Sequence, residues 1–406
     1  MTATTTTGGP ARRGLLASAA GAAGAFALAG WSARDGSPRG AAPAPQDPDP
    51  ATSVRPFRGE HQGGIADQPQ TYAAFAALDL RPDVDRDAVR RLFTVLTDDI
   101  ERLMTGAAPV TDQEPELAAV TAGLTVTVGV GPALVARAGA PAPAWLAPLP
   151  AFSIDRLEER WSGGDLLLQL CAESPTTLAH AQRRLLTAIE PLCTLRWVQR
   201  GFREPFEGEH HPMRNLMGQV DGTVQPEVAG RDAGLLWCGD EGPAWLVGGS
   251  ALVLRRIRMT LDTWDRVDRL SRENAIGRRL DTGAPVTAPA GASATAIADL
   301  NAKDSLGFHV IDDGAHLRRA HAMAPHERFL RRPYSYDDAP TDGSLSDSGL
   351  LFAAFMADPV RQFVPVQQRL ADKDLLNLWT TPVGSAVFAI LPGARDGELL
   401  GERLFA

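Results

Sequence analysis

The sequence predicts an α+β protein with antiparallel sheets, built as two halves. Five short segments alternate apolar and polar residues or are rich in β-formers, which is typical of strands. They lie at 72–80, 123–130, 166–172, 251–259 and 386–391. Helical patterns lie between them, at 85–105, 174–190 and 358–370. After Val54 the order is strand, helix, strand, strand, helix, and a similar order starts again near residue 245. Helices grouped on one face of an antiparallel sheet fit this order better than a parallel βα repeat.

Two helices in the first half are predicted by their apolar spacing. The segment 85–105 places five apolar residues three or four positions apart on one face: Val89, Leu92, Phe93, Leu96 and Ile100. The segment 176–186 does the same with Leu178, Ala181, Leu185 and Leu186. In the second half, 283–298 is rich in Gly, Pro and Ala, and 339–349 in Asp, Ser and Gly, so both are expected to be loops. An apolar segment at 350–356 follows the second loop.

Composition excludes several classes of protein. The 406 residues are 44% hydrophobic and 22% charged, which excludes global disorder and predicts a sizeable core. The formal net charge of −9 argues against a basic nucleic-acid-binding surface. Three cysteines without a CxxC pair exclude four-cysteine zinc and iron–sulfur sites. Any histidine ligand must come from the eight histidines, at 61, 180, 210, 211, 309, 316, 321 and 326.

The first 53 residues are expected to precede the folded part. Arg12 and Arg13 are followed by an Ala/Gly/Leu-rich run without charge, from 14 to 30, that is short for a membrane span. Paired arginines before such a run are typical of a twin-arginine export signal, here residues 1–30, with a cleavage site near Ala29. That route carries folded proteins, which favours a cofactor-containing protein. Residues 31–53 are rich in Pro, Ala and Asp and are expected to be a flexible linker. Loss of the signal removes two arginines and no acid, taking the net charge from −9 to −11.

Three motifs in the second half carry candidate chemistry. In Gly218-Gln219-Val220-Asp221-Gly222, glycines around an acid let the backbone approach a flat ligand, although Asp-Gly is also a common turn. His316 and His321 are five residues apart and do not share a helix face, which argues against a two-histidine metal site. One of them is a candidate axial ligand to an iron cofactor. The pair Arg331-Arg332 is flanked by aromatic residues, which favours partial burial over a solvated face.

Taken in order, these motifs and several others resemble the dye-decolorising peroxidase family, in its exported subgroup that includes deferrochelatases. The resemblance runs from about residue 56 to the C-terminus, and its strongest stretch is Arg214-Asn215-Leu216-Met217-Gly218-Gln219-Val220-Asp221-Gly222-Thr223. The other matching segments are 56–65, 124–132, 161–166, 196–202, 254–259, 276–278 and 382–386. This set of segments, in this order along the chain, is specific for the family, whereas the G-x-x-D-G motif alone is not. It implies two ferredoxin-like halves of the dimeric α+β barrel type, residues 54–213 and 214–406, with haem in the C-terminal half.

The resemblance also implies which residues lie on the distal, peroxide-binding side of the haem. Asp221 matches the distal aspartate, and Gly222 follows it where the loop is expected to approach the haem. Arg332 matches the distal arginine, with Arg331 as the alternative if the register differs by one residue. Phe352 is expected to line the distal pocket, with ordinary core packing as the alternative. Pro333 stands where the family often has glycine, a departure that would reshape the distal loop.

On the proximal side, His316 matches the histidine that binds the haem iron, with His309 next in line. Asp374 matches the acid that hydrogen-bonds this imidazole. Arg278 matches an arginine that contacts a haem propionate, and its guanidinium suits a carboxylate. The family often has Asn-Pro soon after the histidine, whereas residues 322–325 here read Ala-Met-Ala-Pro.

These matches imply one haem b per chain and a peroxidase that reduces hydrogen peroxide. Through a ferryl intermediate it would oxidise dyes, phenolics or other one-electron donors. The alternative is a deferrochelatase that releases iron from haem in an exported iron-uptake system. The expected partners are hydrogen peroxide, small-molecule electron donors and, during export, the twin-arginine translocase, with no nucleic acid. A homo-oligomer is left open. The expected location is secreted, periplasmic or otherwise extracytoplasmic. Tyr334, Tyr336 and Trp379 are candidate electron relays, with packing as the alternative for each.

Overall fold

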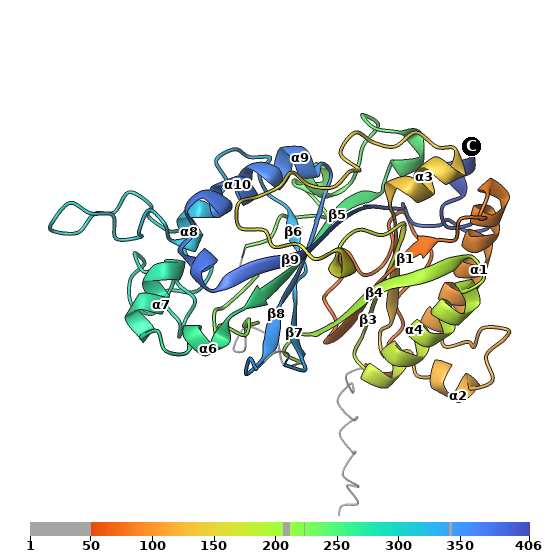
Figure 1. The fold of residues 1–406 in the computed structure, drawn as a ribbon, viewed down its shortest axis with the longest axis horizontal. Coiled ribbons are helices and arrows are strands. Elements are labelled where there is room, and N and C mark those ends of the chain that lie inside the picture. The colour runs from red at the N-terminus through yellow and green to blue at the C-terminus, as the bar shows by residue number, and fades with distance from the viewer. Residues whose placement is uncertain (1–49, 206–211, 223, 341–342) are drawn as a thin grey trace, which may run out of the picture. The chain divides into compact units, whose positions relative to one another are not determined.

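The strands form one antiparallel sheet. The computed structural model describes residues 50–205, 212–222, 224–340 and 343–406, all within one compact unit. In this part of the chain nine strands follow the order β5-β9-β2-β3-β1-β4-β7-β8-β6, and β5 also pairs with β8 (Figure 1). The strands are β1 (Tyr72–Leu80), β2 (Thr125–Val130), β3 (Leu166–Ala172), β4 (Cys193–Phe202), β5 (Ser250–Met259), β6 (Leu330–Arg331), β7 (Tyr334–Asp338), β8 (Asp347–Met356) and β9 (Thr380–Ile390). The helices are α1 (Arg86–Met104), α2 (Pro115–Ala118), α3 (Pro132–Ala138), α4 (Pro175–Ile189), α5 (Ala233–Leu236), α6 (Leu261–Trp264), α7 (Arg269–Ile276), α8 (His316–Arg319), α9 (Pro359–Gln362) and α10 (Val364–Lys373).

Each half has the strand order of a ferredoxin-like fold. The first half runs β1, α1, β2, β3, α4, β4, and its sheet order is β2-β3-β1-β4. In the second half the pairings of β5 with β8 and β9, and of β7 with β8, give the equivalent order β7-β8-β5-β9. The predicted α+β class, with two ferredoxin-like halves and antiparallel sheets, is therefore confirmed.

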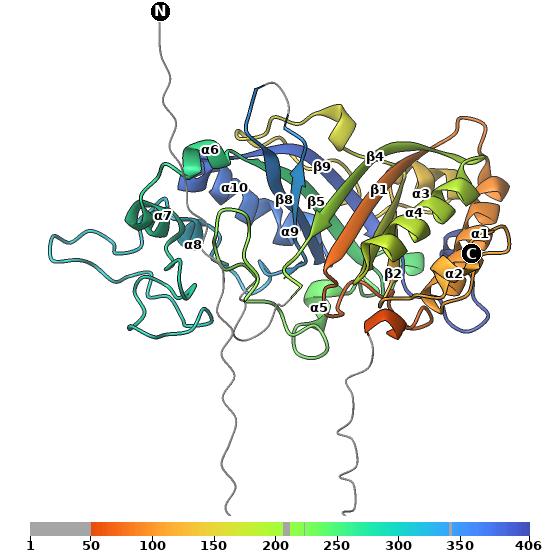
Figure 2. The ribbon, with the colours of Figure 1, turned by 90° about the horizontal axis from the view of Figure 1, so that it is seen from below.

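The two halves close into a barrel along two short seams. At one seam β4 pairs with β7 only where Phe202 faces Ser335. At the other, β2 pairs with β9 at two positions, beginning with Gly129 opposite Ile390. Figure 2 shows α1, α3 and α4 beside the strands of the first half, and α7, α8 and α10 at the end of the second. Helices α1, α3 and α4 therefore pack on the outer face of the first half's sheet, and the interior cluster comes mainly from strands, with Leu236 of α5 (Ala233–Leu236) added.

Strand β1 shows how the sequence fills both cores. Phe75 and its second neighbours Ala73 and Ala77 join an interior cluster drawn from strands of both halves, with Tyr334 and Phe388 among its members. The alternate residues of β1 join a second cluster, which the helices cover. This follows from strand geometry, because successive side chains point to opposite faces of a sheet. The five residues predicted to form the apolar face of the first helix are all buried in α1, as expected.

Several element boundaries differ from the prediction. The predicted helix 358–370 is two helices, α9 and α10, which meet at Phe363 because Pro365 has no N–H to continue the hydrogen-bond ladder. Strand β4 was not predicted, since its exposed Leu195 and buried Gln199 blur the apolar alternation. Strand β9 begins at Thr380, six residues before the predicted start. Strand β8 begins at Asp347, inside the predicted loop 339–349, whereas 283–298 holds no helix or strand, as predicted.

The expected export signal, residues 1–30, lies outside the described residues, as does the expected linker up to residue 49. The described part of the expected linker, residues 50–53, includes a short 3-10 helix, Pro50–Thr52. Among the described residues, no helix has the length and apolar character needed to cross a membrane. The boundary placed between residues 213 and 214 falls between β4 and β5 and stays a prediction.

Candidate active site

His316 and Asp374 come together from separate segments of the second half. His316 begins α8, and Asp374 follows α10, where it caps the short 3-10 helix Leu375–Leu378. His316 Nδ1 lies 2.6 Å from Asp374 Oδ2, and Asp374 Oδ1 accepts the backbone N–H of Leu376 at 2.9 Å. Because an ionised carboxylate can only accept hydrogen bonds, Nδ1 carries the proton. The buried carboxylate therefore fixes both the orientation and the tautomer of the ring.

Burial and neighbouring charges together set the charge state of His316. Partial burial opposes the charged imidazolium, but the adjacent Asp374 carboxylate outweighs it and raises the pKa of His316 above its usual value. Asp221 acts in the same direction, and Arg331 opposes it. Nε2 makes no hydrogen bond to any described residue, and 38% of the side chain is exposed. An imidazole with Nδ1 on a carboxylate and Nε2 available is the usual arrangement of a metal-ligating histidine.

Asp221 lies beside Arg331. The side chain of Asp221 is 17% exposed, and its Oδ1 accepts the N–H of Gly222 at 2.6 Å and lies 3.7 Å from Arg331 Nη1. Gly222 has a φ of +72°, a conformation that favours glycine. Arg331 is held in turn, because its Nη2 donates to Val224 O at 3.0 Å and its backbone N–H donates to Gln225 Oε1 at 3.0 Å. The Asp221 carboxylate and the Arg331 guanidinium therefore lie next to each other.

The structure places Arg332 elsewhere. Its side chain is 1% exposed and donates to Asp67 O at 2.5 Å and to Gln70 Oε1 at 2.6 Å, both in the first half. Arg331 and Arg332 diverge because β6 ends at Arg331 and consecutive residues of an extended chain point to opposite sides. The arginine beside Asp221 is therefore the alternative, Arg331, and the distal assignment of Arg332 is not supported by this geometry.

Arg278 lies within electrostatic reach of Asp221 and Arg331. It follows Gly277, which ends α7 with a φ of +85°, and its Nη1 donates to Gly283 O at 2.7 Å and to Ala294 O at 2.8 Å. Burial lowers the pKa of Arg278, and the positive charge of Arg331 lowers it further. A partly buried guanidinium without a carboxylate partner among the described residues suits an anionic ligand.

Phe352 has the contacts of a packing residue. It lies on β8, and its ring centroid is 6.3 Å from that of Phe329 and 6.0 Å from that of Phe363. Its expected place in the distal pocket stays a prediction. His309, the second candidate ligand, has its Nδ1 2.9 Å from Asp313 Oδ1 in a partly exposed pair.

The candidate relay residues differ in their surroundings. Tyr334 is fully buried and donates to Cys171 Sγ at 3.4 Å, and burial raises the pKa of this phenol. Tyr336 is buried under the guanidinium of Arg256, 4.0 Å from the ring centroid. Trp379 is half-buried, with its ring edge-on to Trp264 at 5.0 Å. Trp379 therefore combines partial exposure with an aromatic neighbour.

Sequence reasoning missed two residues that position the site. Gln225 clamps Arg331, because its Nε2 donates to Arg331 O at 2.8 Å while its Oε1 accepts the N–H of the same residue. Trp264 is buried and donates from Nε1 to Met217 O at 3.0 Å, which anchors the loop that carries Asp221. Neither residue had a signal in a single sequence, since both act through backbone atoms of distant segments.

Comparison with known proteins assigns the family. Residues 62–203 match the family model described as Dyp-type peroxidase, N-terminal, and residues 212–395 match Dyp-type peroxidase, C-terminal. A dye-decolorizing peroxidase of Thermobifida fusca (strain YX) is 38% identical over 364 residues, covering 84% of this chain and 83% of that one. A deferrochelatase of Escherichia coli (strain K12) is 31% identical over 414 residues, covering 96% and 95%.

Solved structures agree with these matches. A DyP-type peroxidase from Cellulomonas bogoriensis superposes with a TM-score of 0.85 at 52% identity, covering 88% of this chain and 99% of that one. Ferric DtpA from Streptomyces lividans superposes with a TM-score of 0.84 at 35% identity, covering 89% and 100%. Both family models and these relatives span most of the chain, so it belongs to the Dyp-type peroxidase family and is a peroxidase.

Proposed function

We propose that this peroxidase works with one haem b per chain, bound through His316. The observation that carries the proposal is the 2.6 Å contact between His316 Nδ1 and the buried Asp374, which leaves Nε2 available for iron. Asp221 and Arg331 supply an acid–base group and a positive charge within electrostatic reach of the same ring. Arg278 is suited to a propionate. The residues present therefore fit a haem with one histidine ligand.

Haem supplies the redox chemistry when bound, and the chain supplies proton transfer and charge stabilisation. Asp221, as the carboxylate, accepts a proton from peroxide and returns it to the departing oxygen. Arg331, 3.7 Å from Asp221 Oδ1, stabilises the negative charge that develops as the O–O bond breaks. Asp374 holds the Nδ1 proton of His316 and raises the donor strength of Nε2. Overall, one peroxide, two protons and two electrons give two waters, and the electrons come from the reducing substrate.

The reducing substrates in this proposal are one-electron donors such as phenolics and dyes. The net charge of −9, or −11 without the expected signal, disfavours anionic dyes through general repulsion, which makes neutral phenols the better candidates. Trp379 is the preferred relay for donors too large to reach the site, because it is half-buried and its ring contacts that of Trp264.

Release of iron from haem is the second candidate function. It is favoured by the deferrochelatase of Escherichia coli, whose 31% identity extends over 96% of this chain. The two functions are distinguished by incubating the protein with haem. Free iron and intact porphyrin indicate iron release, whereas bleaching of a phenolic donor only with peroxide indicates peroxidase turnover.

Export by the twin-arginine route is proposed on the pattern around Arg12 and Arg13 alone. Cleavage near Ala29 would be seen by mass spectrometry of the N-terminus of the secreted protein. Replacing both arginines with lysine would block export. The proposed homo-oligomer is tested by light scattering on the haem-loaded protein.

The decisive experiment for the proposed function is the absorption spectrum of the purified protein with and without peroxide. A haem Soret band that changes on addition of one equivalent of peroxide is expected. A protein that stays colourless after reconstitution with haem refutes the proposal. Substitution of His316→Ala should remove haem binding or change the iron spectrum, and an unchanged spectrum would point to His309 instead.

A further inference from the structure

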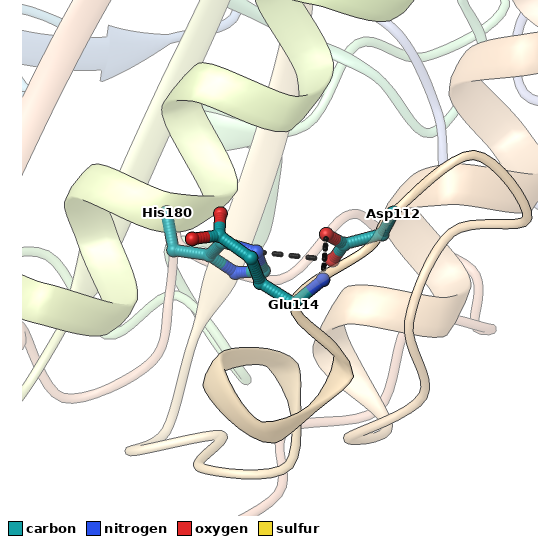
Figure 3. A group of neighbouring side chains, drawn as sticks. All are labelled: Asp112, Glu114 and His180. Carbon is teal, nitrogen blue, oxygen red and sulfur yellow. Dashed lines mark hydrogen bonds and ion pairs between the residues drawn. The ribbon is translucent and has the colours of Figure 1, made fainter.

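A second group of ligand-type side chains lies in the first half of the molecule. Asp112 lies between α1 and α2, Glu114 immediately precedes α2, and His180 lies on α4. One ligand atom from each lies within 4.8 Å of the other two. Figure 3 shows the carboxylate of Asp112 facing the imidazole of His180, with the Glu114 side chain crossing the ring in this view. The peroxidase site lies in the other half, so the mechanism proposed above does not use this group.

Two of the three side chains are fully buried, and each has one atom, Asp112 Oδ2 and His180 Nε2, without a hydrogen bond among the described residues. The side chains of Asp112 and His180 are 0% and 2% exposed. His180 Nε2 and Asp112 Oδ2 lie 3.0 Å apart, yet the contact does not have hydrogen-bond geometry, and neither atom has another hydrogen bond among the described residues. Buried polar atoms are nearly always satisfied in native proteins, so a pair left in this way needs an explanation. A shared ligand supplies one.

The spacing of these atoms suits a small cation. Two ligand atoms about 2.1 Å from a tetrahedral zinc ion lie roughly 3.4 Å apart, close to the separation of His180 Nε2 and Asp112 Oδ2. Asp112 is already oriented, because its Oδ1 accepts the N–H of Glu114 at 3.0 Å and so leaves Oδ2 for the ion. Glu114 is half-exposed and can supply the third ligand atom, a second carboxylate oxygen, which leaves one position for water.

The charged groups around Asp112, Glu114 and His180 favour a positive ion. Arg183 contacts Glu114 Oε2, and Arg184 Nε lies 4.0 Å from Asp112 Oδ1. A third carboxylate, the buried Asp99 on α1, lies within electrostatic reach of both Asp112 and Arg184. Three carboxylates and two guanidinium groups give the region a net negative charge when His180 is neutral.

We propose that Asp112, Glu114 and His180 form a binding site for a divalent transition-metal ion, with water as the fourth ligand. One imidazole nitrogen and two carboxylate oxygens are the borderline donor set that Zn²⁺ accepts, and Ca²⁺ and Mg²⁺ prefer oxygen alone. The ion joins the segment between α1 and α2 to α4. Its role is structural, because it fixes a connection on the helical side of the first half.

The test uses the full haem-loaded protein without a histidine tag. Bound metal is first stripped with a chelator, and the chelator is then removed. Zn²⁺ binding is measured by calorimetric titration. The zinc and iron content per chain is measured by mass spectrometry. One zinc per chain and a thermal midpoint that rises with Zn²⁺ concentration are expected. The variants Asp112→Asn and His180→Gln should each weaken zinc binding at least about tenfold, since even outer-shell changes have effects of that size. Glu158→Gln, a surface carboxylate paired with Arg160, is the matched control and should bind zinc like the wild type.

Two results would overturn the proposal. One is the absence of saturable zinc binding by the wild type, and the other is equal affinity in the wild type and both variants. If the variants fail to fold, zinc X-ray absorption on the wild type decides. One imidazole with oxygen ligands supports the site, and sulfur ligands or no imidazole refute it.

Discussion

The neighbouring arginines 331 and 332 should respond to the same substitution in opposite ways. Arg332→Leu removes a side chain that is 1% exposed and leaves Asp67 O and Gln70 Oε1 without their donor. Each buried acceptor left unsatisfied costs about 1–3 kcal/mol. Part of this loss of stability is offset, because the folded protein no longer has to desolvate the Arg332 guanidinium. A net loss of about 3 kcal/mol follows, which lowers the Tm of a domain of this size by several degrees.

Arg331→Leu should leave the fold intact and damage the reaction. The side chain is 28% exposed, and it loses one hydrogen bond, to Val224 O, and its contact with Asp221. Changes at partly exposed positions usually alter stability by no more than about 0.5–1 kcal/mol. Loss of a group that stabilises developing negative charge typically lowers a rate about 10²–10³-fold. The rate constant for reaction with peroxide should fall by that factor.

Both variants are measured by stopped-flow mixing with peroxide and by thermal unfolding of the haem-loaded protein. Arg331→Lys is the control for charge, and it should recover part of the peroxide rate. Loss of the peroxide reaction in Arg332→Leu at an unchanged Tm, together with a wild-type rate in Arg331→Leu, would refute the roles assigned to the two arginines.

Three other predictions concern carboxylates. Asp221→Asn should slow reaction with peroxide about 10²–10⁴-fold without loss of haem, as measured by stopped-flow, because the acid–base group is gone. Asp374→Asn should speed haem transfer to an acceptor protein about tenfold or more, because one amide oxygen must then serve both His316 and a backbone N–H. Arg328 lowers the pKa of Asp232 from 3.8 to about 2, so this pair stabilises the fold above about pH 3.8, and that contribution is lost as the pH falls to about 2. In Arg328→Gln the Tm should be lower at neutral pH and converge with the wild type near pH 2, and parallel Tm curves would contradict this.

Much of the fold could be predicted because periodic apolar patterns are local. The stripe beginning at Val89 fixed the face of α1, and the alternation around Phe75 placed β1 between two cores. Elements with mixed burial were harder to predict. Strand β4 exposes Leu195 and buries Gln199, so no apolar alternation marks it. Strand β9 carries Pro382 at an irregularity in its pairing with β5, and this hid its first half.

The candidate site was predicted by resemblance, and the geometry places Arg331, the alternative, beside Asp221. His316 and Asp374 are 58 residues apart, and nothing local links them until α8 and α10 bring them together. Arg331 and Arg332 have the same chemistry, so only the direction of each side chain distinguishes them. Gln225 was not predicted because it acts on the backbone of Arg331, and one sequence carries no record of such contacts.

The two short seams make the molecule resemble a dimer whose subunits share one chain. Only short strand ladders join the two halves of the sheet among the described residues, and interior packing such as that of Phe75 against Tyr334 adds to them. A chain cut between residues 203 and 212 would give two fragments, each with an uncovered apolar sheet face. Each fragment would depend on the other for solubility, and mixing them would rebuild the barrel and, with it, the surroundings of Arg332.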